Sequence, residues 1–132
     1  MLFRSASGST VVSFLSGALL GGSSLSGGYA GAKRMQHFLV NYGQREADRM
    51  ELGLRFLSII PKQLIAGTEI GTMASAAYAE SARLSVEKFM GQWDHPLTAA
   101  FASTHLIDLL RRAPEAGASA FAITGDGVAA MT

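Results

Sequence analysis

Three residues of the N-terminal part, Ser16, Tyr29 and Lys33, carry side chains that exchange protons or polarise oxygen atoms. Tyr29 and Lys33 are four positions apart, so on a helix their side chains share one face. A phenol has an ordinary pKa of about 10, too high to exchange protons readily at neutral pH, and a nearby ammonium stabilises its charged form. The pair is therefore a candidate acid–base unit, and a serine hydroxyl beside it would hydrogen-bond a substrate oxygen.

The elements that must position these residues follow from apolar runs and their breaks. The run "STVVSFL" at 9–15 predicts a buried strand, and the glycine-rich segment from Gly17 to Gly28 predicts a loop. A helix is predicted from Tyr29 to about Met50. Ser16 would then stand at the carboxyl end of a strand, where ligands collect in parallel α/β sheets.

An apolar stripe marks one side of the predicted helix, and its members recur at intervals of three and four residues: Met35, Phe38, Leu39 and Tyr42. Packing on the sheet would explain this stripe, and so would pairing with a second copy of the helix, which would bury Met35, Phe38 and Tyr42. Gly43 lies within the stripe and disfavours the helix by about 1 kcal/mol relative to alanine.

The second half of the chain continues the alternation of strands and helices. A strand apolar on both faces is predicted at 54–60, "LRFLSII", and Pro61 ends it. A loop at 62–72, an alanine-rich helix from Met73 to Met90, and a helix from about Leu97 to Arg112 follow. The strand "SAFAIT" at 119–124 and the turn "GDG" come last.

This order predicts an α/β fold with a parallel sheet of about three strands and flanking helices, in a single domain over 1–132. Three strands make a small sheet, and about three helices are available to cover its two faces. The pattern therefore indicates part of a larger sheet.

Composition excludes several classes of protein. With 48% hydrophobic and 16% charged residues the chain is not disordered, and a formal charge of +1 favours no binding to nucleic acid. The absence of cysteine excludes disulfides and thiolate metal sites, and His37, His95 and His105 lack the spacing of a metal site. No apolar run reaches the ~20 residues of a membrane span, so we expect a cytoplasmic protein.

A family resemblance rests on the combination of these features. Ser16, twelve intervening residues, then "YAGAK" followed by Arg34, resembles the active-site signature of short-chain dehydrogenases/reductases. The strand "RFLSIIP" and the turn "TGDG" are similar to later landmarks of that family. The resemblance covers nearly the whole chain but only the C-terminal half of a family member. It implies a partial Rossmann-like, doubly wound parallel sheet, without the N-terminal dinucleotide-binding half.

The resemblance also implies roles for individual residues. Tyr29 would be the general acid/base at the oxygen of a carbonyl or alcohol substrate, and Ser16 would orient and polarise that oxygen. Lys33 would stabilise the phenolate and hydrogen-bond the nicotinamide ribose of NAD or NADP. Pro61 and Leu64 match the loop that holds the nicotinamide. The hydride itself belongs to the cofactor.

The chain departs from the family at several positions. Lys62 stands where the family usually has glycine, and Ala66 stands where it has threonine, with Thr68 close but out of register. The glycine-rich phosphate turn, the residue that selects NAD or NADP, and a helix asparagine of the catalytic set have no counterpart. We therefore expect negligible turnover from the chain alone. Substrate, cofactor preference and direction stay open.

Two other interpretations remain. In the first, the chain is a non-enzymatic α/β fragment that acts as an oligomerisation or binding module through an exposed apolar sheet edge. Alternatively, its first residues loosely resemble a secretory signal, and a small secreted domain with a cleaved leader would lose Ser16.

The family also pairs copies through the helix corresponding to Tyr29–Met50, which implies a homo-oligomer. In the family, the region that corresponds to residues 73–95 lies over the substrate. Four large side chains fall in this region, and we expect them to pack in the core: Met73, Tyr78, Phe89 and Trp93.

Overall fold

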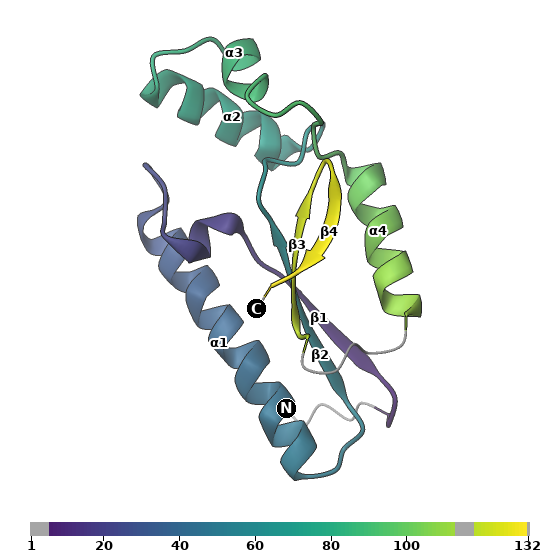
Figure 1. The fold of residues 1–132 in the computed structure, drawn as a ribbon. Helices are drawn as coiled ribbons and strands as arrows, with labels where there is room; N and C mark the ends of the chain where they lie inside the picture. Colours follow the sequence, from purple (N-terminus) through teal and green to yellow (C-terminus); the bar gives the residue numbers. More distant parts are fainter. Residues whose placement is uncertain (1–5, 113–117, 132) are drawn as a thin grey trace.

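An open four-stranded sheet forms the centre of the fold, and the computed structural model describes residues 6–112 and 118–131. Its strands, in order across the sheet, are β1 Thr10–Phe14, β2 Arg55–Pro61, β3 Ala120–Thr124 and β4 Gly127–Ala130. β1, β2 and β3 are parallel, whereas β4 runs antiparallel to β3 (Figure 1). The α/β class is confirmed, but the expected end of the chain in a turn is corrected, because that turn is a hairpin leading into β4.

The burial of β1 and β2 differs sharply. The central residues of β2 are buried from Leu57 to Ile60, as a strand covered on both faces requires. β1 lies at the edge of the sheet, and its residues are exposed or half-buried, with Val11 38% and Phe14 46% exposed. The prediction of a buried strand at 9–15 is therefore wrong in its burial, because an apolar run does not reveal whether a second strand pairs on its outer side.

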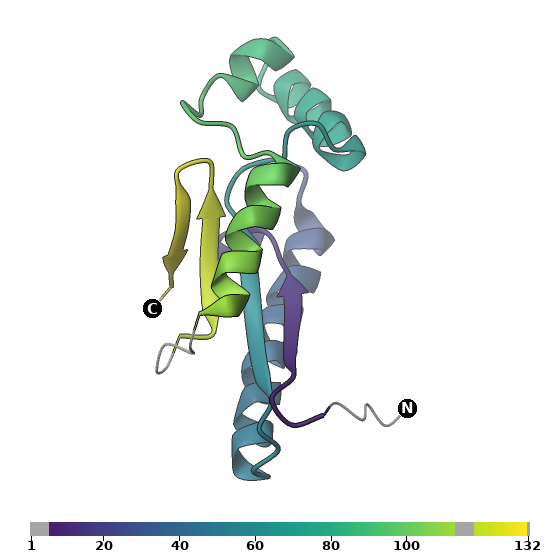
Figure 2. The same cartoon turned by 90° about the vertical axis from the view of Figure 1, so that its right-hand side faces the viewer.

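Two helices cover opposite faces of the sheet. α1 Gly27–Arg49 lies on one face and α4 Ala99–Arg111 on the other (Figures 1 and 2). The larger core cluster joins α4 to the sheet through Leu57, Ile59, Leu97, Ala102, Leu109, Phe121 and Ile123. Burial of such side chains stabilises the fold by about 25 cal/mol per Å² of apolar surface.

The face of α1 that packs on the sheet is not the predicted stripe. Val40 and Ala47 are the buried residues of this helix. Gly43 permits close packing, because a Cβ there would lie 3.0 Å from a ring carbon of Phe56. The four stripe residues point outward instead and are 48–65% exposed: Met35, Phe38, Leu39 and Tyr42. Packing of the stripe on the sheet is therefore contradicted.

The predicted helix at 73–90 is two helices. α2 Glu69–Ser81 begins earlier, because the Thr68 side chain accepts a hydrogen bond from Gly71 N and caps it. α3 Val86–Met90 begins after a second cap, in which the Ser85 hydroxyl accepts from Lys88 N. Both lie beyond the carboxyl ends of the parallel strands (Figure 1).

No helix in the described part of the chain is both long and apolar enough to cross a membrane.

Candidate functional site

A cavity of about 490 Å³ lies at the carboxyl ends of β1 and β2, between the start of α1 and α2. Its lining includes all five residues singled out from the sequence: Ser16, Tyr29, Lys33, Pro61 and Leu64. Parallel pairing of β1 with β2 brings the segments that follow these strands together. Phe14 of β1 stands opposite Ile59 of β2, and both strands end on the same side of the sheet.

Ser16 follows the end of β1 and caps η1, the single 3₁₀ turn Gly17–Leu20. Its Oγ accepts a hydrogen bond of 3.2 Å from Ala18 N, which leaves the hydroxyl proton free to donate. Gly17 lies close to the end of β2, because a Cβ there would lie only 3.2 Å from the Pro61 carbonyl oxygen. The two strand ends are therefore in close contact beside the cavity.

Tyr29 and Lys33 lie in the first turns of α1, so their segment is helical as predicted. The Lys33 Nζ is 5.7 Å from the centre of the Tyr29 ring and donates a 3.0 Å hydrogen bond to the Phe14 carbonyl oxygen. The second contact ties the ammonium to the end of β1. The Tyr29 side chain is half exposed, which leaves the phenol accessible from solvent.

The loop after β2 is held by Gln63, which the sequence analysis did not single out. Its amide nitrogen donates to the His95 carbonyl oxygen at 3.2 Å, and its amide oxygen accepts from Gly125 N at 2.7 Å. These bonds connect the loop that carries Leu64 to the segment before α4 and to the β3–β4 turn. Thr68, the out-of-register threonine, lines the cavity and caps α2.

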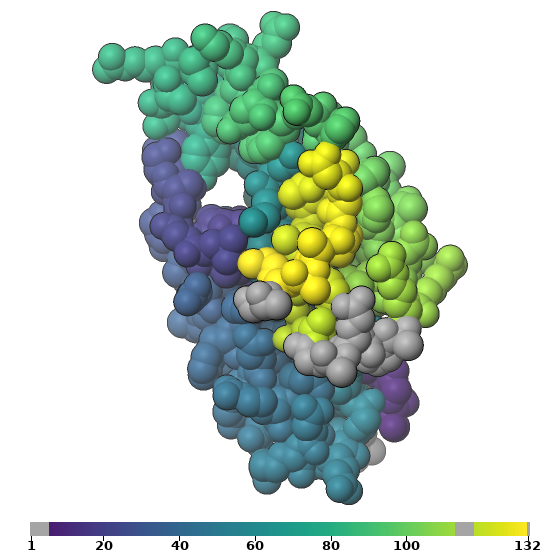
Figure 3. Space-filling view, viewed as in Figure 1, coloured from purple at the N-terminus to yellow at the C-terminus, as the bar shows by residue number. Residues whose placement is uncertain are grey.

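The roof of the cavity contains Tyr78, for which core packing was expected. Its phenol oxygen and the Ser23 hydroxyl are 2.7 Å apart, which joins α2 to the loop before α1. Phe89 stacks on Tyr78 at 6.0 Å, and Trp93 meets Phe89 edge-on at 5.8 Å. The space-filling view shows an opening beside this roof, between the loop and α2 (Figure 3).

Met73, also expected in the core, is 68% exposed on α2. The expectation of core packing is therefore wrong for Met73. An alanine-rich helix with few large side chains gives no clear periodicity from which the cavity-facing side could have been chosen.

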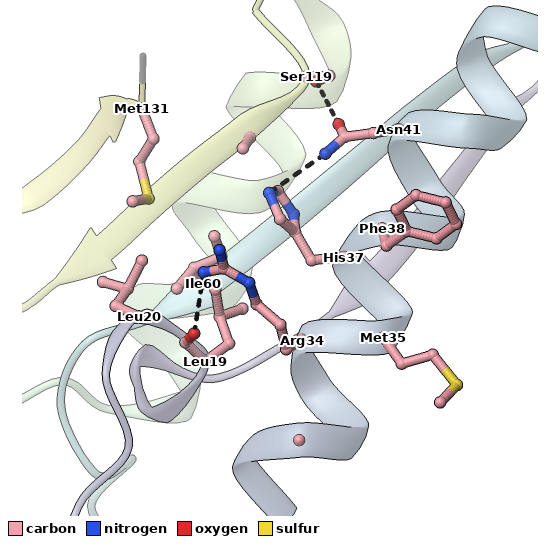
Figure 4. A pocket seen from close by; sticks show the side chains of 12 residues that line it. Leu19, Leu20, Arg34, Met35, His37, Phe38, Asn41, Ile60, Ser119 and Met131 are labelled. Carbon is pink, nitrogen blue, oxygen red and sulfur yellow. Dashed lines mark hydrogen bonds between the residues drawn. The ribbon is translucent and has the colours of Figure 1, made fainter.

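A second pocket, of about 910 Å³, lies between α1, η1 and β3 (Figure 4). A chain of polar contacts crosses it: His37 Nδ1 is 3.1 Å from Ser58 Oγ, and His37 Nε2 is 3.3 Å from Asn41 Nδ2. The Ser119 hydroxyl donates to Asn41 Oδ1 at 3.2 Å. Burial, and secondarily the Arg34 guanidinium, lower the pKa of His37 below its ordinary value of 6.5. These contacts anchor α1, and with it Tyr29, to the sheet.

The other histidines have separate surroundings. His95 Nδ1 is 2.6 Å from an Asp126 carboxylate oxygen in an exposed pair, and the His105 ring lies 4.2 Å from that of Phe101. Among residues 6–112 and 118–131 no three His, Cys, Asp or Glu side chains gather as metal ligands would.

No family model, no curated protein and no solved structure matches this chain.

Proposed function

We propose that the chain carries the catalytic part of an NAD(P)-dependent oxidoreductase of the short-chain dehydrogenase/reductase type, acting on a carbonyl or alcohol. The supporting observation is that Ser16, Tyr29, Lys33, Pro61 and Leu64, from two strand ends and one helix, line one cavity. Ser16, Tyr29 and Lys33 have the side chains that their roles in the resemblance require.

In the direction of reduction, the Ser16 hydroxyl donates a hydrogen bond to the carbonyl oxygen and draws electron density toward it. The Tyr29 phenol transfers its proton to that oxygen while the carbonyl carbon receives a hydride, so the carbonyl becomes an alcohol. The Lys33 ammonium stabilises the phenolate that remains. Oxidation of an alcohol follows the same path in reverse.

A nicotinamide cofactor, when bound, supplies or accepts the hydride. The described residues fit one end of it: Lys33 keeps two N–H donors for ribose hydroxyls, and Pro61 and Leu64 lie across the cavity. For the diphosphate there is no matching turn, because no strand precedes β1 within residues 6–112 and 118–131. We therefore expect weak binding that depends on the nicotinamide end alone.

Reduction of 2-octanone tests this function, with NADH, NADPH or reduced nicotinamide mononucleotide as the hydride donor at millimolar concentration. At micromolar donor we expect negligible turnover, because the described residues offer no turn for the diphosphate. At millimolar donor we expect slow turnover that rises in proportion to the donor concentration and is the same for all three donors. Tyr29→Phe keeps the ring and removes the proton, and should lower the rate at least ~100-fold. Tyr42→Phe, on the same helix but outside the cavity lining, is the matched control and should keep the wild-type rate.

Turnover that survives Tyr29→Phe unchanged would exclude this mechanism. So would the absence of turnover above the reaction without protein at every donor concentration.

A second candidate is a binding module that pairs with another copy of the chain. The outward stripe on α1 favours it, since Met35, Phe38, Leu39 and Tyr42 are large apolar side chains about half or more exposed. The apolar edge strand β1 adds unpaired backbone groups. The oligomeric state tests this candidate independently of turnover.

A further inference from the structure

The wall of the catalytic cavity is largely apolar. Carbon side chains reach it from β1, the loop before α1, the loop after β2 and α2: Phe14, Leu25, Leu64, Ile65, Ile70 and Ala74. No carboxylate is among its lining residues, and Lys33 supplies the charge. A volume of about 490 Å³ is within the range of small-molecule sites.

Two polar residues of the lining, Ser26 before α1 and Thr68 before α2, form hydrogen bonds within the protein. The Ser26 hydroxyl accepts from Ser23 N at 2.7 Å and donates to Ser23 O at 2.8 Å. The Thr68 hydroxyl donates to Ile65 O at 2.8 Å and accepts from Gly71 N at 3.0 Å. Neither hydroxyl has a proton left to offer a ligand.

Gln63 and Tyr78 are engaged in part, because the Gln63 amide keeps one N–H and the Tyr78–Ser23 pair keeps one hydroxyl proton. The amide of Gln63 uses its nitrogen for the His95 carbonyl oxygen and its oxygen for Gly125 N. The Tyr78 phenol oxygen pairs with the Ser23 hydroxyl. A ligand with many hydroxyl groups would lose its bonds to water and find few replacements along these walls.

Ser16, Lys33 and Tyr29 add free polar groups to the lining. Ser16 keeps its hydroxyl proton after accepting from Ala18 N, and Lys33 keeps two N–H donors beyond its bond to the Phe14 carbonyl. The Tyr29 phenol makes no hydrogen bond with any of the described residues. A few free polar groups in an otherwise apolar lining suit a ligand with one oxygen function and a hydrocarbon body.

We propose that the substrates are uncharged ketones, aldehydes or alcohols with a single oxygen and an apolar body, to the exclusion of polyols and 2-oxo acids. The carboxylate of a 2-oxo acid would need a cation of its own. Lys33 is the cationic side chain in the lining, and in the proposed mechanism it stabilises the Tyr29 phenolate. This inference rests on the proposed function for turnover, whereas the binding of the apolar body does not depend on it.

Saturation-transfer NMR and calorimetry would compare three probes that share a ketone: 2-octanone, 2-oxooctanoate and dihydroxyacetone. We expect 2-octanone to bind at least ten-fold more tightly than the other two. Ala74→Phe fills the cavity from α2 and should weaken 2-octanone binding at least ten-fold. Ala76→Phe, on the same helix but outside the lining, should leave it unchanged.

Ala77→Phe also places a ring in the lining and replaces Ala74→Phe if the latter loses the wild-type helical circular dichroism. Equal affinity for the three probes, or 2-octanone binding that neither filling variant weakens, would overturn the proposal. Binding of 2-octanone without reduction contradicts the proposed function and supports this inference. Equal reduction of all three ketones supports the function and contradicts this inference.

Discussion

Two glycines of α1, Gly31 and Gly43, meet different surroundings. A Cβ on Gly31 would meet no atom within 4 Å, so Gly31→Ala should stabilise the protein by about 1 kcal/mol through helix propensity. Gly43→Ala gains the same propensity but presses on the Phe56 ring, which costs about 1–3 kcal/mol. Urea denaturation should therefore show a higher free energy of unfolding for Gly31→Ala than for Gly43→Ala. Equal gains would mean that Phe56 moves aside freely.

His37 predicts a dependence of stability on pH. Its pKa is lowered in the folded chain, mainly by burial, so the unfolded chain takes up the proton first as the pH falls. Stability is therefore complete above the ordinary pKa of 6.5 and declines as the pH drops through it toward the lowered value. Protonated Nε2 would also face the amide of Asn41, which is a donor.

The measurement is urea denaturation at about pH 7.5 and about pH 5.5 for the wild type and His37→Gln. The difference between the two pH values should be smaller in His37→Gln. His105→Gln leaves the polar chain of His37 in place and should behave as the wild type does. An unchanged difference in His37→Gln would show that other groups cause it.

At the scale of elements, α1 has two roles that lie on different faces. Its inner side is anchored to the sheet by Val40, Ala47 and the His37 contacts, and its first turns carry Tyr29 and Lys33 to the cavity. Its outer stripe has no cover among the described residues. A change on the outer side should therefore alter association without altering the cavity.

Phe38→Glu tests that separation by placing a charge in the stripe, where Phe38 is 59% exposed and stacks with Tyr42. If copies pair through α1, sedimentation should show a dimer for the wild type and a monomer for Phe38→Glu. Gln36→Glu adds the same charge outside the stripe and should keep the dimer. A monomeric wild type would exclude the binding module formed by two copies.

At the scale of the whole molecule, the helices over the strand ends are held differently from the sheet. α3 has no buried residue and α2 has three, Gly71, Ser75 and Ala79, whereas β2 is buried through its centre. The Ser23–Tyr78 pair connects α2 to the loop before α1, and the exposed His95–Asp126 pair connects the segment after α3 to the β3–β4 turn. Local opening is cheapest where burial is least.

Hydrogen exchange should therefore be at least ~10-fold faster in residues 69–90 than in β2. Tyr78→Phe removes the contact with Ser23 and should accelerate exchange in α2 while leaving α4 unchanged. Equal acceleration in both helices would indicate general destabilisation instead of opening of the roof.

Much of the local structure could be predicted from the sequence alone. The apolar runs and Pro61 located β1 and β2, and the spacing of Tyr29 and Lys33 placed them on one helix face. These features depend on residues near one another along the chain, so they can be predicted from the sequence without knowledge of the tertiary structure. The sequence analysis predicted neither the caps at Thr68 and Ser85 nor the break between α2 and α3, because the alanine-rich stretch has no clear periodicity.

Tertiary structure decided which surfaces are covered. The sequence determined that β1 and the stripe of α1 are apolar, but their exposure follows from strand order and from the close approach of Gly43 to Phe56. It determined the residue types at Ser16, Tyr29 and Lys33, whereas parallel pairing of β1 with β2 brought Pro61 and Leu64 to the same cavity. Periodicity records which residues share a side of an element; only packing selects the neighbour that side meets.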